Sequence, residues 1–183
     1  WQGCARMSIR TDGPVDCTLA FRIPGWCRRA AVTAPEGIAR TDREGYCYLS
    51  GTCRDGDAVA LDFDMEVRFV AANPRVREDV GKAAVVRGPI TYCAEEADNG
   101  RDLHLCRLDP AGRGQVRVDM EDVLGFPLAA LRVPAWREVP SPPGDELYRE
   151  YAPPALERMT LRLIPYFAWA NRGEGEMRVW LRV

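Results

Sequence analysis

A strict alternation of apolar and polar residues over positions 58–69 constrains the fold of this chain most strongly. In an extended conformation, one side of this segment would carry large apolar residues and the other small or charged ones: Val59, Leu61, Phe63, Met65, Val67 and Phe69 against Ala58, Ala60, Asp62, Asp64, Glu66 and Arg68. A period of two residues is typical of a β-strand with one buried face. Because the run exceeds the usual strand length, we expect a bend or a handover between two sheets within it.

Shorter alternations of the same kind recur along the chain, and turn residues separate them. They predict strands at 5–9, 15–23, 83–87, 90–94, 103–108, 116–120, 128–133, 158–164 and 177–183, with short strands around Val32 and 46–49. No segment shows a sustained apolar period of 3.6 residues. This pattern predicts an all-β fold, an antiparallel β-sandwich of the jelly-roll kind.

A polar break over residues 71–81 favours two packed modules, with the first at 1–73 and the second at 74–183. We expect the first module to be truncated at its N-terminus, because residue 1 reads as a position inside a longer gene product. Six prolines between 134 and 157 predict a long irregular excursion over the surface.

Charge and cysteine content limit the partners and the compartment. A net charge of −2 and a pI near 5.6 argue against a nucleic-acid or membrane-surface binder. The odd number of cysteines argues against a disulfide framework. The chain has no Cys-x-x-Cys pair, so the cysteine spacing gives no indication of a zinc site. We therefore expect the protein to be cytoplasmic and its seven cysteines to be buried, reduced thiols. These are Cys4, Cys17, Cys27, Cys47, Cys53, Cys93 and Cys106.

Residues capable of catalysis form no convincing constellation, so the sequence predicts no catalytic residue and no metal ligand. His104 has no nucleophile motif near it and reads as a surface strand residue. Two groups of carboxylates have the appearance of solvated faces: Glu95, Glu96 and Asp98, and then Asp62, Asp64 and Glu66.

Aromatic residues are the strongest functional candidates. Tyr166, Phe167 and Trp169 lie in the connection between the last two predicted strands, where a loop is normally polar. Such rings either pack down on the core or are displayed to a sugar or a protein partner. Further candidates for the same roles are Trp26, Tyr46, Tyr48, Trp136, Tyr148 and Tyr151.

Three motifs occur in one order along the chain: Phe21-Arg-Ile-Pro-Gly-Trp26, Arg87-Gly-Pro-Ile-Thr-Tyr-Cys-Ala-Glu95, and the stretch from Ile164 to Trp180 with its sequence IPYFAWANRGEGEMRVW. Together they resemble the C-terminal part of glycoside hydrolase family 127, the β-L-arabinofuranosidase family. The last motif is the most specific, and the resemblance spans most of the chain.

The resemblance implies a chain from an enzyme with an α-helical barrel followed by two β-sandwich domains. In that family a zinc-bound cysteine nucleophile, further Cys and Glu zinc ligands and a Glu acid/base lie in the barrel. Their adjacent cysteines have no counterpart here, so no catalytic or zinc-binding role transfers, and Cys93 lies in a motif outside the barrel.

The expected function is therefore a non-catalytic region that scaffolds the barrel and takes part in dimerisation. By the same resemblance, the fragment is inactive and lacks a cofactor, and its bacterial parent hydrolyses L-arabinofuranosides. Tyr166, Phe167 and Trp169 are then expected to be buried supports. The alternative is an autonomous carbohydrate-binding module that uses these three rings.

Overall fold

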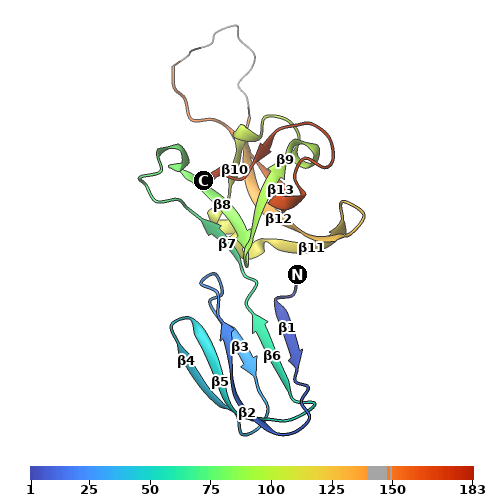
Figure 1. Cartoon of the computed structure of the whole chain (residues 1–183). Helices are drawn as coiled ribbons and strands as arrows, with labels where there is room; N and C mark the ends of the chain where they lie inside the picture. Colours follow the sequence, from blue (N-terminus) through green and yellow to red (C-terminus); the bar gives the residue numbers. More distant parts are fainter. Residues whose placement is uncertain (140–147, 149) are drawn as a thin grey trace. The chain divides into compact units, whose positions relative to one another are not determined.

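The computed structural model describes residues 1–139, 148 and 150–183, and these form two compact units, Trp1–Glu66 and Val67–Val183 (Figure 1). Both units are built almost entirely from β-strands, which confirms the predicted all-β class. The units divide after residue 66 rather than after residue 73. The reason is that β7 (Val67–Val70) pairs with β8 (Lys82–Arg87) and so belongs to the second unit.

Unit 1 is a sandwich of two three-stranded antiparallel sheets. In spatial order, one sheet contains β1 (Cys4–Ser8), β6 (Ala58–Phe63) and β3 (Ala30–Thr33), and the other contains β2 (Val15–Arg22), β5 (Tyr46–Cys53) and β4 (Ala39–Arg43). Leu49 of β5 and Val59 of β6 share one buried cluster, so the two sheets pack face to face. The sequence did not reveal β4, because every residue of that strand is exposed and it has no apolar face.

The long alternation at 58–69 is divided between the two units, as the expected handover requires. β6 ends at Phe63 and pairs with strands of unit 1, whereas β7 begins at Val67 and pairs with β8 of unit 2. Val59 and Leu61 are buried on the inner face of β6, and Asp62 on the other face is exposed.

Unit 2 contains a nine-stranded sheet that closes on itself. Beyond β7 and β8 its strands are β9 (Ile90–Glu95), β10 (Cys106–Leu108), β11 (Arg117–Asp122), β12 (Pro127–Glu138), β13 (Leu156–Pro165), β14 (Met177–Arg178) and β15 (Leu181–Arg182). β8 pairs with both β15 and β9, which completes a ring of strands through β13, β12 and β10. The enclosed core includes Tyr92, Leu131 and Leu163, all of them fully buried.

The predicted irregular excursion at 134–157 is wrong at both ends. β12 continues through Pro134 to Glu138, and β13 already begins at Leu156. Pro134 is tolerated because its carbonyl accepts a hydrogen bond from the Asp109 N–H (3.1 Å), so its nitrogen points toward the same edge. There the neighbouring strand changes from β11 to β10, and a missing N–H costs no ladder hydrogen bond. Residues 140–147 and 149 lie outside the described part of the chain.

Helical turns replace strand at several predicted positions. The structure has one short α-helix, α1 (Glu96–Asn99), and four 3₁₀ turns among its described residues: η1 (Arg77–Asp79), η2 (Leu103–Leu105), η3 (Pro110–Gln115) and η4 (Tyr166–Ala168). The strand predicted at 103–108 is a strand only from Cys106, because residues 103–105 form turn η2, whose first N–H, that of Leu103, donates to the side chain of Glu176 at 2.7 Å. The strand predicted at 177–183 is divided into β14 and β15.

All seven cysteines are free, and five of them are buried. Within the described residues, no helix has both the length and the apolar character required to cross a membrane.

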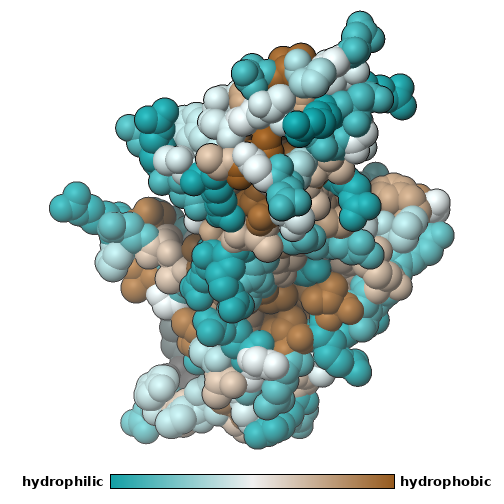
Figure 2. Space-filling view, turned by 90° about the horizontal axis from the view of Figure 1, so that it is seen from below, coloured by the Kyte–Doolittle hydropathy of each residue, from teal (hydrophilic) through white to brown (hydrophobic). Residues whose placement is uncertain are grey.

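Figure 2 shows one face on which hydrophobic residues are exposed in patches between hydrophilic ones. The large apolar side chains exposed in unit 2 include Val118, Met120, Phe126, Tyr166, Phe167 and Trp169.

Candidate functional site: an exposed aromatic turn

The turn that follows β13 is anchored by its smallest side chain. Turn η4 is closed by a hydrogen bond from the Trp169 N–H to the Tyr166 carbonyl, at 3.1 Å. Ala168 is completely buried and packs in a cluster with Cys93 and Ile164. Successive side chains of a 3₁₀ turn point about 120° apart. Burial of Ala168 therefore directs its neighbours away from the core.

The three aromatic side chains of this turn are exposed. Tyr166, Phe167 and Trp169 expose 46, 60 and 42% of their surface, and we call them the aromatic patch. The rings of Tyr166 and Trp169 stack, with centroids 6.0 Å apart and planes inclined by 15°. The expectation that these rings are buried supports is wrong, because Ala168 occupies the core position of the turn.

A chain of ion pairs fixes the loop behind the aromatic patch. Arg172 pairs with Glu95 and Asp98, and its Nη1 lies 2.8 Å from a carboxylate oxygen of Asp98. Arg162 of β13 pairs with the same Asp98 and with Glu121 of β11. Glu95 also accepts a hydrogen bond from the Ala170 N–H at 2.9 Å. Strands β9, β11 and β13 are thereby tied to the segment that carries the aromatic rings.

The charges in this network stabilise one another. Burial alone would raise the pKa of Asp98, but hydrogen bonds and charges from Arg172 and Arg162 outweigh it, so the pKa lies below its usual range. The pKa of Glu121 is lowered in the same way, with burial opposed chiefly by the hydrogen bond from Arg162. The hydrogen bond to Asp98 raises the pKa of Arg172 above its usual range. These carboxylates are therefore ionised anchors and have no proton to donate at neutral pH.

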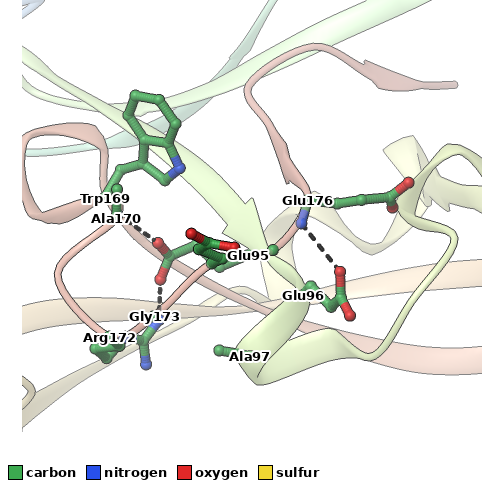
Figure 3. Close-up of a pocket in the computed structure, with 10 residues that line it drawn as sticks. Glu95, Glu96, Ala97, Trp169, Ala170, Arg172, Gly173 and Glu176 are labelled. Atoms are coloured by element: carbon green, nitrogen blue, oxygen red, sulfur yellow. Dashed lines mark hydrogen bonds and ion pairs between the residues drawn. The ribbon is translucent and has the colours of Figure 1, made fainter.

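A pocket of about 440 Å³ lies beside the patch, between α1 and residues 170–176. Figure 3 shows Trp169 on one side of the pocket and Glu96 and Glu176 across from it, while the Glu95 carboxylate reaches Ala170 and Arg172. The Glu176 N–H donates to the Glu96 carboxylate at 3.0 Å, and the Glu96 N–H donates to the Glu176 carbonyl at 2.9 Å. The pocket thus combines an indole ring with carboxylate groups held in place by backbone hydrogen bonds.

The prediction that Glu95, Glu96 and Asp98 form a solvated face is wrong for two of the three. Glu95 is only 6% exposed, and the side chain of Asp98 is 9% exposed within its ion pairs. Their arginine partners lie more than sixty residues away in sequence, so local spacing carries no signal for this network. The second group does form surface ion pairs, in which Glu66 and Asp64 face Arg28 and Arg29.

The other candidate residues do not join the aromatic patch. Trp26 packs edge-on against Phe63 and Tyr46 lies beside Tyr48, both within unit 1. Trp136 is covered by the Arg158 guanidinium at 4.8 Å. His104 is exposed, as expected, although it lies in η2 and not in a strand.

Cys93 is not a reactive thiol, and the described residues form no metal-binding cluster. Cys93 is 1% exposed, and burial raises the pKa of its thiol to about 12, so it is protonated at neutral pH and unsuited to nucleophilic attack. Among residues 1–139, 148 and 150–183, no group of three or more His, Cys, Asp or Glu side chains is arranged to hold a metal ion. The resemblance places the zinc ligands in the barrel, so we assign no step through zinc to these residues.

Comparison with known families accounts for both units. The model of the β-L-arabinofuranosidase GH127 middle domain matches residues 1–65, and that of the glycoside hydrolase family 127 C-terminal domain matches residues 67–182. The chain belongs to glycoside hydrolase family 127. The change from one domain model to the next coincides with the division between the two units after Glu66.

Similar proteins align with the whole chain. A non-reducing end β-L-arabinofuranosidase from Bifidobacterium longum subsp. longum is 42% identical over all of this chain and 29% of its own length. The crystal structure of a GH127 β-L-arabinofuranosidase from Geobacillus stearothermophilus T6 superposes with a TM-score of 0.89 at 39% identity, again over the whole chain and 29% of that protein. A further GH127 β-arabinofuranosidase structure gives a TM-score of 0.82 at 33% identity. The chain therefore spans less than a third of the length of these relatives.

Proposed function

We propose that this chain is the accessory, non-catalytic β-sandwich region of a bacterial glycoside hydrolase that acts on β-L-arabinofuranosides, and that it scaffolds the catalytic barrel of that enzyme. One observation carries the proposal: the middle and C-terminal domains of family 127 together account for essentially the whole chain. The protonated, buried state of Cys93 and the engagement of Asp98 and Glu121 with arginines support a structural role for these groups.

The aromatic patch is the surface that we assign to contact with the rest of the enzyme or with a second copy of it. Exposed aromatic rings are characteristic of the centres of protein interfaces, where burial supplies large apolar area at little loss of rotamer freedom. The buried Ala168 and the network around Arg172 hold in place the segment that carries the patch. Preorganisation of this kind reduces the entropic cost of association.

The scaffold function is tested on the full-length parent by replacing Phe167, the most exposed ring of the patch, with alanine. We expect a lower melting temperature, or dissociation of a dimer in light scattering, with the far-UV circular dichroism unchanged. Tyr151→Ala is the matched control, because Tyr151 is 88% exposed and lies outside the patch. Identical melting and assembly of the two variants would remove the patch from the scaffold function.

Exposure of the patch also favours a second candidate, an autonomous carbohydrate-binding module. The outer face of a tryptophan can stack on the C–H face of a sugar, and the carboxylates of the adjacent pocket can accept hydrogen bonds from sugar hydroxyls. Pockets that combine apolar rings with a few polar groups are typical ligand sites. In this chain, that combination is Trp169 with Glu96 and Glu174.

Calorimetric titration of the chain with arabino-oligosaccharides separates the two functions. Saturable heat that disappears in Trp169→Ala but persists in Tyr151→Ala would establish sugar binding at the patch. We expect no saturable heat in either variant or in the unmodified chain, since the scaffold function requires none.

A further inference from the structure

Two cysteine thiols meet on neighbouring strands of unit 1. Cys17 lies on β2 and Cys53 at the end of β5, and their Sγ atoms are 3.3 Å apart. Both side chains point into the sandwich, because Cys17 shares a strand face with Leu19 and Phe21 and Cys53 shares one with Cys47 and Leu49. This pair has no role in the accessory function proposed above.

The register of the two strands explains why these side chains meet. Cys53 pairs with Val15, and Cys17 pairs with Gly51, so the two cysteines are diagonal neighbours. Diagonal side chains in an antiparallel sheet are normally farther apart than directly opposed ones. Gly51, the residue directly opposite Cys17, has no side chain, and the Ile38 side chain lies over it, 2.9 Å from where a Cβ would stand. The thiol of Cys17 therefore meets no side chain from its directly paired residue and approaches Cys53 instead.

The two thiols differ in their access to solvent. Cys53 is 3% exposed, whereas Cys17 is half-buried. Cys17 lies two residues along β2 from Val15, which pairs with Cys53 and is exposed. The hydrogen bond with Cys17, assisted by burial, raises the pKa of the Cys53 thiol. Cys17 is therefore the thiol that a reagent in solution reaches, and Cys53 is the thiol held beside it.

We propose that Cys17 and Cys53 are a redox modification site, which low-molecular-weight disulfides such as oxidised glutathione convert reversibly into a cross-strand disulfide. The Cys17 thiolate attacks one sulfur of the oxidant, forms a mixed disulfide and releases one thiolate. Cys53 then loses its proton and attacks the Cys17 Sγ, which breaks the mixed disulfide and releases the second thiolate. The protein loses two electrons and two protons, and the oxidant becomes two thiols.

Thiol–disulfide exchange makes this bond reversible, because a reduced thiol can attack the disulfide and return it through the same mixed-disulfide intermediate. The bond would join β2 to β5 across residues 36 apart in sequence. It would therefore make the stability of unit 1 dependent on the redox state of its surroundings.

The test incubates the chain in glutathione buffers of increasing oxidised-to-reduced ratio, followed by acid quenching, alkylation of free thiols and non-reducing peptide mapping. We expect the peptide containing Cys17 linked to the peptide containing Cys53 to become the major species, and to disappear with dithiothreitol. The other five cysteines should remain alkylated. Oxidation should also raise the melting temperature of unit 1.

Single replacements distinguish the pair from other thiols. Cys17→Ser should abolish the cross-link and leave Cys53 free, because no thiol remains at position 17 to form the mixed disulfide that Cys53 attacks. Cys4→Ser should leave the cross-link unchanged, although Cys4 is the exposed cysteine. Absence of the Cys17–Cys53 peptide from the folded, unmodified chain under the most oxidising buffer would overturn the proposal. So would mixed disulfides with glutathione that persist on Cys17 without transfer to Cys53.

Discussion

Replacing Arg162 with methionine probes the ion-pair network behind the aromatic patch. The Arg162 side chain is 14% exposed and pairs with two carboxylates, Asp98 at 9% and Glu121 at 21% exposure. Removing one partner of a buried ion pair costs about 3–5 kcal/mol, because the remaining charge loses its compensation. Asp98 keeps Arg172 and Glu121 keeps Arg132, so we expect a loss near the lower end, about 3 kcal/mol, at neutral pH.

The loss of unfolding free energy in Arg162→Met should depend on pH, and the pKa shifts of Asp98 and Glu121 give the direction. Asp98 and Glu121 have folded-state pKa values below their unfolded values, so their contribution is complete above the unfolded pKa and is lost as pH falls through the folded pKa. Without Arg162 their pKa values move back toward the ordinary range, and the variant has less stability to lose on acidification. The difference in unfolding free energy between the two proteins should therefore shrink as pH falls below about 4.

Urea denaturation followed by circular dichroism measures this difference, and hydrogen exchange of the β13 amides reports on unit 2 alone. Arg101→Met is the matched control, since Arg101 also faces a carboxylate, Glu96 at 3.3 Å, but its side chain is 88% exposed. Exposed ion pairs contribute little to stability, so the control should behave like the unmodified chain. Equal losses in the two variants, or a difference that grows toward acid, would refute the reasoning.

Three further predictions concern single side chains. Trp169→Ala should cost about 1 kcal/mol or less in urea denaturation, because the ring is 42% exposed; a loss of about 3–5 kcal/mol would show that it supports the core. Gly112→Ala should cost about 1–3 kcal/mol, because the new Cβ would lie 2.7 Å from the Pro134 Cβ. Gly114→Ala is its control, with no atom within 4 Å of the new Cβ, and equal stabilities would contradict the packing around Pro134. With a maleimide, Cys4 should be labelled first and Cys93 last, since Cys93 is 1% exposed with a pKa of about 12, and early labelling of Cys93 would contradict its burial.

Strand periodicity predicted most of the fold because burial on one face leaves a direct record in the sequence. The runs that became β2, β6, β8 and β9 each place apolar residues toward a core, and the excessive length of the 58–69 run correctly indicated a handover. Strand β4 left no such record because none of its residues is buried. Pro134 misled the prediction, since its tolerance depends on which strand lies beside it, and this is a property of the tertiary structure.

The candidate site was only half visible in the sequence. Unusual aromatic composition singled out Tyr166, Phe167 and Trp169, but it could not decide between burial and display. That choice depends on Ala168, whose small side chain fills the core position of η4. The network of Arg162, Arg172 and Asp98 could not be foreseen, because residues more than sixty positions apart are brought together only when β13 pairs with β9.

The most direct test of the accessory, non-catalytic assignment is a turnover measurement on the 183-residue chain itself. The chain would be incubated at high concentration with a chromogenic β-L-arabinofuranoside and zinc, beside the full-length parent at matched molar concentration. Our account predicts release of the chromophore by the parent and none above the buffer rate by the chain. Sustained release by the chain that is lost in Cys93→Ser would contradict it.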